Sequence, residues 1–433
     1  MKKHIKLFVL LGILLVGSFS FYLFKGFKKD NMVYKDNKIN PLSSGIAMMF
    51  ETEAGLGNYE MTTRSEWPTE GYVFNENLSK CEKGSKLSWD NENKKVLMSG
   101  NKSDKCYVYF DVYVKPQVLL ADYVKSLYTG TQGENSIYYH DSSLTNGAGD
   151  NSYRYAGASD QVNNYVCFGS NVTPCPTDNL YRIIGVFGDK VKLIKSDYAT
   201  SALLGADGDY SKMYTANNWD NSTYKGNNLA NVAAYNWDKS GTNTWSLSNL
   251  NKTNLNTNFI ANIGADWAAK IADTTWKVGG NTWANIGTQP AKTAYQNEIV
   301  SPVTTNSKDN KTEYSAKIGL MYVSDYMYAA PQDKWTLVGY NGSYASKDYR
   351  AATSVNWMYM GLYEWAISRN ADYSNSVFYV INTGRVGHGG VGGVACGVRP
   401  VFNLSSSVNY VSGSGTAADP ILVNLWLGIM HVC

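Results

Sequence analysis

The stretch Leu180-Tyr-Arg-Ile-Ile-Gly-Val-Phe187, followed by Gly188-Asp189 and then Lys190-Val-Lys-Leu-Ile-Lys195, carries the clearest structural signal in the chain. Two β-prone runs joined by Gly-Asp predict a β-hairpin. Similar runs, separated by Asn, Gly and Ser turns, occur on both sides of it, at residues 71–74, 86–89, 94–98, 106–114, 316–323, 377–381 and 397–404. Pro400 places the last of them at a sheet edge or at the start of its own strand.

Helical periodicity is confined to two segments. In residues 117–128 apolar side chains recur at i, i+3, i+4 and i+7, and the pattern stops at Gly130. Residues 256–275 show the same spacing through Phe259, Ile263 and Trp267. Many strands with few helices predict an α+β fold.

The N-terminus predicts membrane attachment. Three lysines precede an apolar run at residues 7–24, and three more follow it. Its eighteen residues would reach about 27 Å as a helix, enough to span the hydrocarbon core of a bilayer. The nearest small-residue cleavage motif, Gly17-Ser18-Phe19-Ser20, is followed by bulky aromatic residues, which favours a retained signal anchor over a cleaved signal peptide. We therefore expect a single-pass cell-membrane protein with residues 1–30 as its anchor and its bulk outside the cell.

Six cysteines fit an oxidising compartment. Cys81 and Cys106 flank two strand-like runs, and Cys167 and Cys175 flank a short Gly/Asn/Pro loop, so each pair is expected to form a local disulfide worth about 2–3 kcal/mol. Buried free thiols are the alternative. The remaining two cysteines, Cys396 and Cys433, have no local partner, and none of the four histidines lies near a CxxC motif that could hold zinc.

The order of these signals gives a domain plan. After the anchor we expect a polar stalk at residues 31–43, a small disulfide-linked β module at 44–115 and a main domain at 116–420. An apolar tail at residues 421–433 ends the sequence. The tail is too short to span a bilayer and could be an extra edge strand or the product of a frameshift.

Composition bears on the partners. The net charge is only +3 and 17% of residues are charged, without a basic stripe, so nucleic acid is not an expected partner. The sequence instead holds 33 Tyr, 12 Trp and 39 Gly, a mixture typical of surfaces that bind by stacking and adaptable hydrogen bonds. A β-rich secreted protein with many turns would show a similar composition.

The segment Gly397-Val-Arg-Pro-Val-Phe-Asn-Leu-Ser-Ser-Ser-Val408, with Gly413-Ser-Gly-Thr-Ala-Ala-Asp-Pro420 after it, resembles a domain of unknown function common in secreted proteins of Gram-positive gut bacteria. The resemblance covers residues 116–420. Its supporting residues are Tyr181-Arg-Ile-Ile-Gly185, Ile318-Gly-Leu-Met-Tyr-Val-Ser-Asp325, Asn356-Trp357 and Trp365-Ala-Ile-Ser-Arg369.

That family is similar to the C-type lectin-like fold shared by formylglycine-generating enzymes and by the variable proteins of diversity-generating retroelements. The resemblance implies a twisted antiparallel sheet with few helices, long loops and a ligand face on its final strands and loops. It implies scaffold roles for Trp357, Trp365, Arg399 and Pro400. Residues 373–395 would then supply the ligand-facing side chains, which are Tyr373, Asn375, Tyr379, Asn382, Arg385 and His388.

Motifs for catalysis are missing from the sequence. It contains no Gly-x-Ser-x-Gly, His-Glu-x-x-His, Walker or Rossmann motif and no reactive cysteine pair of a formylglycine-generating enzyme. We therefore expect no catalytic residues, metal or cofactor, and a surface protein or glycan as the ligand. Two alternatives remain: an extracytoplasmic enzyme of this fold with an altered active site, and a pilin-like structural subunit.

Overall fold

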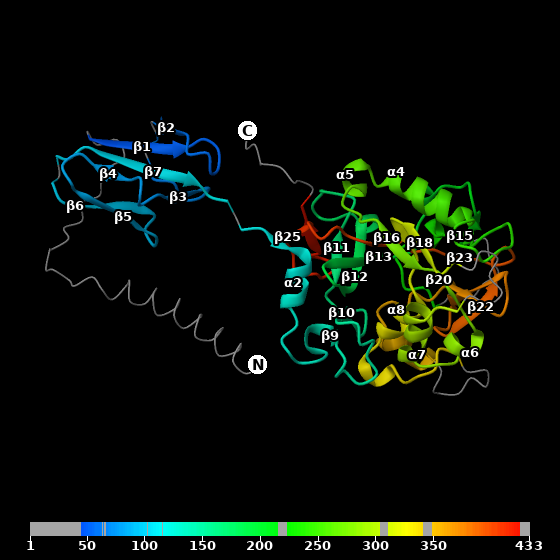
Figure 1. Cartoon of the computed structure of the whole chain (residues 1–433). Helices are drawn as coiled ribbons and strands as arrows, with labels where there is room; N and C mark the ends of the chain where they lie inside the picture. The colour runs from blue at the N-terminus through cyan, green and yellow to red at the C-terminus, as the bar shows by residue number, and fades with distance from the viewer. Residues whose placement is uncertain are drawn as a thin grey trace. The chain divides into compact units, whose positions relative to one another are not determined.

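The computed structural model describes residues 45–424, except 63, 65, 102, 115, 215–222, 304–310 and 341–348. The chain divides into two compact units, Met1–Pro116 and Gln117–Cys433 (Figure 1). The expected anchor, the stalk and Cys433 lie outside the described residues. None of the helices in the described part of the chain has the length and hydropathy needed to cross a membrane.

The first unit is an all-β module. Its sheet has the strand order β2-β1-β7-β3, with β4 also paired to β7, and a separate β5–β6 hairpin completes the unit. Phe110 lies at the centre of its core, with ring centroids 5.3 Å from Phe50 and 5.6 Å from Trp89 on the hairpin. Its strands are β1 (Ile46–Glu51), β2 (Tyr59–Thr62), β3 (Tyr72–Phe74), β4 (Lys80–Cys81), β5 (Lys86–Asp90), β6 (Lys95–Ser99) and β7 (Cys106–Val112).

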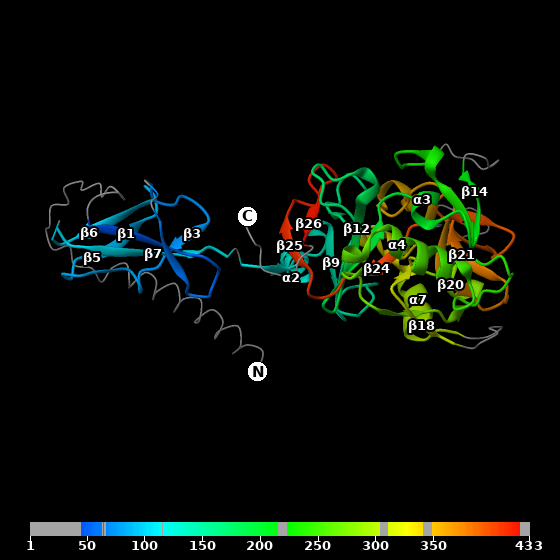
Figure 2. The ribbon, with the colours of Figure 1, turned by 90° about the horizontal axis from the view of Figure 1, so that it is seen from above.

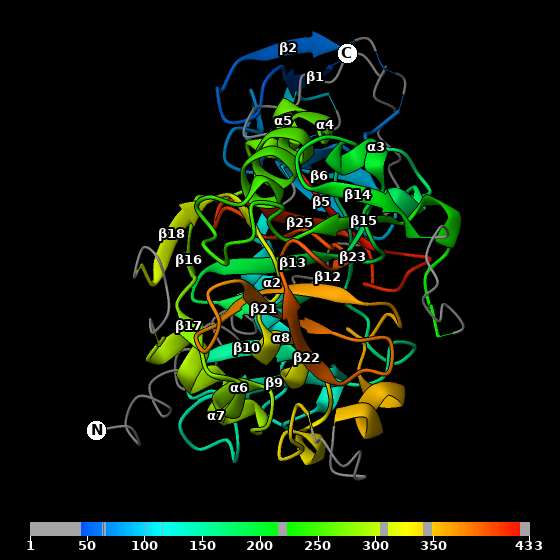
Figure 3. The ribbon, with the colours of Figure 1, turned by 90° about the vertical axis from the view of Figure 1, so that its right-hand side faces the viewer.

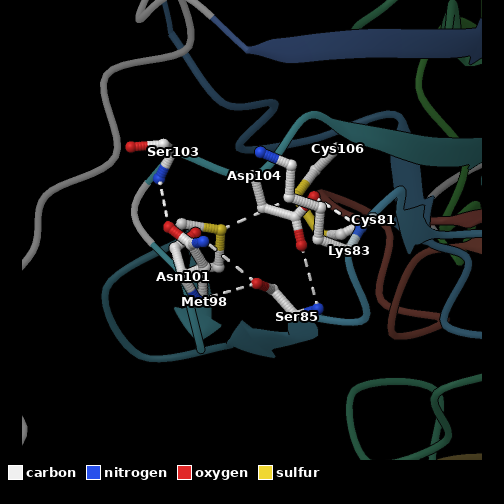
Figure 4. Close-up of a disulfide and its surroundings, with 8 residues drawn as sticks. All are labelled: Cys81, Lys83, Ser85, Met98, Asn101, Ser103, Asp104 and Cys106. Carbon is white, nitrogen blue, oxygen red and sulfur yellow. Dashed lines mark hydrogen bonds between the residues drawn. A yellow bond between two sulfur atoms is a disulfide. The ribbon is translucent and has the colours of Figure 1, made fainter.

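Both expected disulfides are present. Cys81 and Cys106 are direct partners in the β4–β7 ladder, so their bond joins two neighbouring strands. Beside this bond, the Asp104 carboxylate accepts the backbone N–H groups of Lys83 (2.7 Å) and Ser85 (3.0 Å), as Figure 4 shows. The second bond, Cys167–Cys175, closes a short loop in the other unit. The prediction of local disulfides is therefore confirmed.

The second unit contains two main sheets. One has the order β19-β24-β13-β12-β11-β26-β25-β8, with β10 also paired to β12 and β9 paired to β10. Its strands are β8 (Val118–Leu119), β9 (Ile137–His140), β10 (Ser152–Tyr155), β11 (Tyr165–Cys167), β12 (Leu180–Phe187), β13 (Lys190–Lys195), β19 (Ile318–Gly319), β24 (Val401–Asn403), β25 (Asn409–Ser412) and β26 (Ile421–Val423).

The other sheet has the order β14-β15-β23-β20-β21-β22, with β17 paired to β20. Figure 2 shows β25 and β26 at one end of this unit and β20 and β21 at the other. A short β16–β18 pair stands apart from both sheets. The strands are β14 (Tyr210–Met213), β15 (Ala233–Asn236), β16 (Thr274–Lys277), β17 (Gly280–Asn281), β18 (Glu313–Ala316), β20 (Glu364–Asn370), β21 (Ser376–Val380), β22 (Val386–Gly390) and β23 (Ala395–Gly397).

Short helices flank the sheets on two sides. Figures 1 and 3 show α4 and α5 on one side of the strands and α6 and α7 on the other. The α-helices are α2 (Leu120–Ser126), α3 (Ser201–Leu204), α4 (Ile260–Asn262), α5 (Ala265–Ala268), α6 (Trp283–Ile286), α7 (Ala291–Tyr295) and α8 (Val323–Tyr328). The π-helical segment Leu250–Phe259 continues into α4, and another, Gln296–Val300, follows α7. Sheets with few and short helices are an α+β arrangement, so the predicted fold class is confirmed at this level.

The expected hairpin is formed by β12 and β13. Their antiparallel ladder runs from Tyr181↔Lys195 to Phe187↔Lys190 and contains an irregularity between Ile183 and Gly185. A Cβ atom at Gly185 would lie 2.3 Å from the carbonyl oxygen of Tyr153 on β10. Glycine therefore allows β10 to approach β12 closely at this irregularity.

The prediction of a strand at residues 316–323 is wrong for the second half of the segment. Ala316 ends β18 and Ile318–Gly319 form β19, but Val323 begins α8. The buried Glu298 carboxylate accepts the backbone N–H groups of Val323 and Ser324, each at 3.0 Å. Because such contacts satisfy N–H groups that a helix leaves unpaired at its start, they favour a helix there.

Three other expected elements differ from their predicted bounds. The first helix contains Leu120–Ser126, and the segment predicted as a helix over 256–275 is split by Gly264, whose φ is +86°. The expected strand at 397–404 is divided into β23 and β24, and β24 begins directly after Pro400, which has no N–H to donate. Within the apolar tail, Ile421–Val423 is an internal strand between β11 and β25, and residues 425–433 lie outside the described part.

Candidate functional site

The β21–β22 hairpin carries most of the residues expected to face a ligand. It lies at the end of its sheet, where Phe378 pairs with His388 and Tyr379 pairs with Gly387. Successive side chains of a strand point to opposite faces. Phe378 and His388 therefore share one face of the hairpin, and Tyr379 lies on the other.

On the His388 face, four rings and one guanidinium group follow one another in a row. The His388 ring is stacked on Tyr373, with centroids 5.9 Å apart and planes 6° apart, and lies 4.7 Å from the ring of Trp283. Trp283 is 4.8 Å from Tyr340, and the Arg385 guanidinium lies 4.3 Å from the Tyr340 ring. We call Tyr373, His388, Trp283, Tyr340 and Arg385 the aromatic row. Tyr373 is 55% exposed, and the other four are half-buried.

Trp283 is held in the row by local backbone contacts. It is the first residue of α6, and its backbone N–H donates to the carboxylate of Asp372 at 2.8 Å. The preceding Thr282 caps the helix by accepting the N–H of Asn285 at 3.1 Å. A Cβ atom at Gly287 would overlap the Trp283 ring, so the absence of a side chain there makes room for the indole. Sequence reasoning did not single out Trp283.

His388 is anchored through one ring nitrogen. Its Nδ1 lies 3.2 Å from the Asn370 side-chain nitrogen and 3.1 Å from the Ser376 hydroxyl. An amide nitrogen can only donate, so Nδ1 is the acceptor and the proton of the neutral ring is on Nε2. Burial lowers the pKa of His388, and the charge of Asp372 opposes this shift. The lowered pKa favours the neutral imidazole, which can stack without carrying charge.

On the opposite face of the hairpin, Tyr379 is half-buried. The Tyr379 ring contacts Tyr363 and Trp365, each with centroids 5.5 Å away. Burial raises the pKa of Tyr379 well above its usual value. The half-buried Tyr379 packs against the core, whereas the resemblance implies a ligand-facing role.

Two more expected ligand residues lie apart from the row. The backbone carbonyl of Asn382 accepts the hydroxyl of Tyr359 in the turn between β21 and β22. Asn375 has an exposed side chain, and its carbonyl accepts the N–H of Val391 at 2.9 Å. The structure thus brings three of the six expected residues together in the row.

The expected scaffold residues are buried between and within the sheets. Arg399 lies in the link between β23 and β24, which belong to different sheets, and forms a two-point ion pair with Glu364 on β20. The indole N–H of Trp357 donates to the Tyr155 carbonyl at 2.9 Å. Trp365 donates in the same way to the carbonyl of Tyr235 at 2.8 Å. Trp365 also touches Tyr379, which links these packed residues to the hairpin.

A buried ionic cluster lies elsewhere in the unit. Lys192 pairs with Asp325 at 2.5 Å, Arg154 lies 3.7 Å from the other oxygen of Asp325, and Arg154 pairs with Asp150 at 2.6 Å. Burial raises the pKa of the neighbouring Glu298 to about 7. Four of these five side chains are almost inaccessible to solvent, and Asp150 is partly exposed. The cluster therefore does not form an open active site.

The first unit has a shallow pocket of about 390 Å³. Its two carboxylates already have partners: Glu51 accepts the backbone N–H groups of Gly57 and Val112, and Asp111 accepts the hydroxyl of Tyr59 at 2.6 Å. The lining residues are Glu51, Gly55, Gly57, Tyr59, Asp111 and Val112. Within the described ranges no group of three or more His, Cys, Asp or Glu residues is arranged to hold a metal ion.

Comparison with known proteins identifies no relative of this chain. No family model matches the chain, and no match is found among curated proteins or solved structures. The geometry of the two units is therefore the basis for assigning a function.

Gly387 and Gly389 of β22 lie against the ring of Tyr379. A Cβ atom at Gly389 would lie 2.7 Å from the ring of Tyr379. We expect Gly389→Ala to displace this ring and lower the free energy of unfolding by about 1–3 kcal/mol, measured by denaturant unfolding. Gly393→Ala is the matched control, because nothing lies within 4 Å of its added methyl group. Equal stability of the two variants would contradict this account of the hairpin.

Proposed function

We propose that this protein is a membrane-anchored cell-surface protein that binds a ligand through the C-terminal loops of a lectin-like head. Residues 7–24 would hold it in the membrane, with the rest of the chain extracellular. The observation that carries the proposal is the aromatic row, which stacks Tyr373 on His388 and continues through Trp283. A row with an exposed end and half-buried rings is built to receive flat or apolar surfaces.

The chemistry of the row suits a surface protein or a glycan. Aromatic rings offer large rigid contact areas that lose little conformational entropy on binding. Arg385 adds a cation at one end, and the neutral Nε2–H of His388 supplies a hydrogen-bond donor. The position of these residues on the last hairpin of the sheet agrees with the ligand face that the lectin-like resemblance implies. The same resemblance suggests that the segment 373–395 is diversified, as in retroelement variable proteins.

The two alternative functions receive less support. An enzyme of the formylglycine-generating type would need reactive groups open to substrate, but the ionic cluster around Asp325 is almost entirely buried. Cys396 is a buried free thiol, and burial raises its pKa well above the usual value, which makes it a poor nucleophile. A pilin-like subunit would have no need of an aromatic row at the end of a sheet.

Binding to arrays tests the proposal. We expect the full chain, solubilised in detergent, to bind particular members of glycan or surface-protein arrays, and Tyr373→Ala to weaken this binding about tenfold or more, because hot-spot tyrosines contribute 1–2 kcal/mol or more. Tyr113→Ala is the matched control, since Tyr113 is 52% exposed but lies in the other unit. Absence of binding to every member of the arrays, or an equal loss of binding in both variants, would contradict a ligand face at the aromatic row.

A further inference from the structure

We propose that Lys192 and Asp325 join covalently, through an isopeptide bond that links β13 to the first turn of α8. The Lys192 ammonium nitrogen lies 2.5 Å from Asp325 Oδ2, and the two side chains are only 7% and 3% exposed. The residues are 133 positions apart in the sequence. Their amide would therefore be a long-range cross-link, unlike the two local disulfides.

The surroundings of the pair hold it in one geometry and keep water away. The Lys192 nitrogen lies 4.7 Å from the ring centroid of Tyr322 and 5.3 Å from that of Phe187. The backbone N–H of Tyr322 donates to Asp325 Oδ2 at 3.0 Å, which fixes the carboxylate. Reactants held in contact in this way can react with effective concentrations of about 10⁵ M or more, which an intermolecular reaction cannot reach.

The charges around the pair favour its conversion to an amide. Two opposite charges removed from water carry a desolvation cost that their attraction does not always offset. An amide removes both charges at once. Arg154 is left paired with Asp150 at 2.6 Å, so the neighbouring ion pair stays balanced after the reaction. The Arg154 guanidinium also lies 3.7 Å from Asp325 Oδ1, the oxygen that would become the amide carbonyl.

The reaction needs no oxidant and no added reagent. One proton passes from Nζ of Lys192 to Oδ2 of Asp325 and converts the ion pair to an amine and a carboxylic acid. The amine nitrogen then bonds to Cγ and gives up a second proton, and the bond from Cγ to Oδ2 breaks. Oδ2 leaves with both protons as water. The product is one water lighter than the two separate side chains.

Peptide mass spectrometry of the reduced full chain tests the proposal. Trypsin cannot cleave after an acylated lysine, so we expect peptide 191–195 linked to peptide 318–334, with a mass one water below their sum. The Lys192→Arg variant should lose this species entirely, because arginine keeps the cation beside Asp325 but has no primary amine. Fragmentation of the linked species would locate the bond.

The wild-type digest alone can overturn the proposal. If peptides 193–195 and 318–334 are recovered unlinked in full yield, and no species one water lighter is present, the pair is an ordinary buried ion pair. Because this result depends on the wild-type chain, it stands even if the variant folds poorly. The outcome is independent of ligand binding, so its failure would leave the proposed function of the aromatic row untouched.

Discussion

Substitution of Arg399 by leucine is expected to lower the free energy of unfolding by about 3–5 kcal/mol. The guanidinium of Arg399 contacts both oxygens of Glu364, at 2.8 and 2.9 Å, and donates to the carbonyl of Met358 at 2.6 Å. Both charged side chains are buried, at 0% and 3% exposed. Leucine would leave the Glu364 carboxylate in the core without its cation, which is one of the costliest changes a core can undergo.

The loss of unfolding free energy in Arg399→Leu should be larger at high pH than at low pH. Burial raises the pKa of Glu364 even in the intact protein, against the opposing effect of Arg399. Without Arg399 the folded-state pKa of Glu364 rises further, so the folded variant retains a proton that the unfolded chain has released. A carboxyl group whose pKa is raised by folding contributes stability below its unfolded pKa and loses it as pH rises. The deficit of Arg399→Leu should therefore shrink as pH falls from 8 toward 5.

Denaturant unfolding followed by tryptophan fluorescence measures both effects. The double variant Arg399→Leu with Glu364→Leu should recover much of the stability, because replacing both members of a buried ion pair with apolar residues is often close to neutral. Lys292→Leu is the control for removal of an exposed cation. A deficit that is the same at all pH values, or a double variant as unstable as the single one, would mean that the pair does not act as described.

The sequence predicts the local parts of this molecule better than the long-range parts. The Leu180–Lys195 hairpin and the disulfides Cys81–Cys106 and Cys167–Cys175 join residues that are close in the chain, and turn chemistry or spacing identifies such pairs. By contrast, β1 and β7 pair in parallel although more than fifty residues separate them. No periodicity in either segment specifies its partner.

A continuous apolar run does not distinguish a buried strand from a buried helix, because neither leaves an alternating pattern. The apolar character of residues 316–323 predicts a buried strand, yet Val323 begins a helix. The choice is made by Glu298, which lies 25 residues before Val323 and accepts the N–H groups at the start of α8. The aromatic row likewise joins residues whose proximity the sequence does not reveal. Tyr373 and His388 were identified from a resemblance, while Trp283 lies about ninety positions earlier in a tryptophan-rich segment with no signal of its own.

Trp357→Ala is expected to be the other large loss, about 3–5 kcal/mol of unfolding free energy. Trp357 is fully buried, and its indole N–H donates to the Tyr155 carbonyl at 2.9 Å. The Arg182 guanidinium lies 4.7 Å from the ring centroid. Alanine would leave a large cavity, an unpaired carbonyl and a buried cation without its aromatic neighbour, and these costs add to the lost burial of the ring.

Trp283→Ala separates the structural role of tryptophan in this protein from its proposed role in binding. Trp283 has the same side chain but is half-buried in the aromatic row, between Tyr340 and His388. We expect its removal to cost clearly less stability than Trp357→Ala, since less surface leaves the core, yet to weaken ligand binding on the arrays. Thermal unfolding and array binding, measured on both variants, give two independent readouts. If Trp357→Ala is as stable as the wild type, the ring is not a core element, and if Trp283→Ala binds normally, the row is not the ligand face.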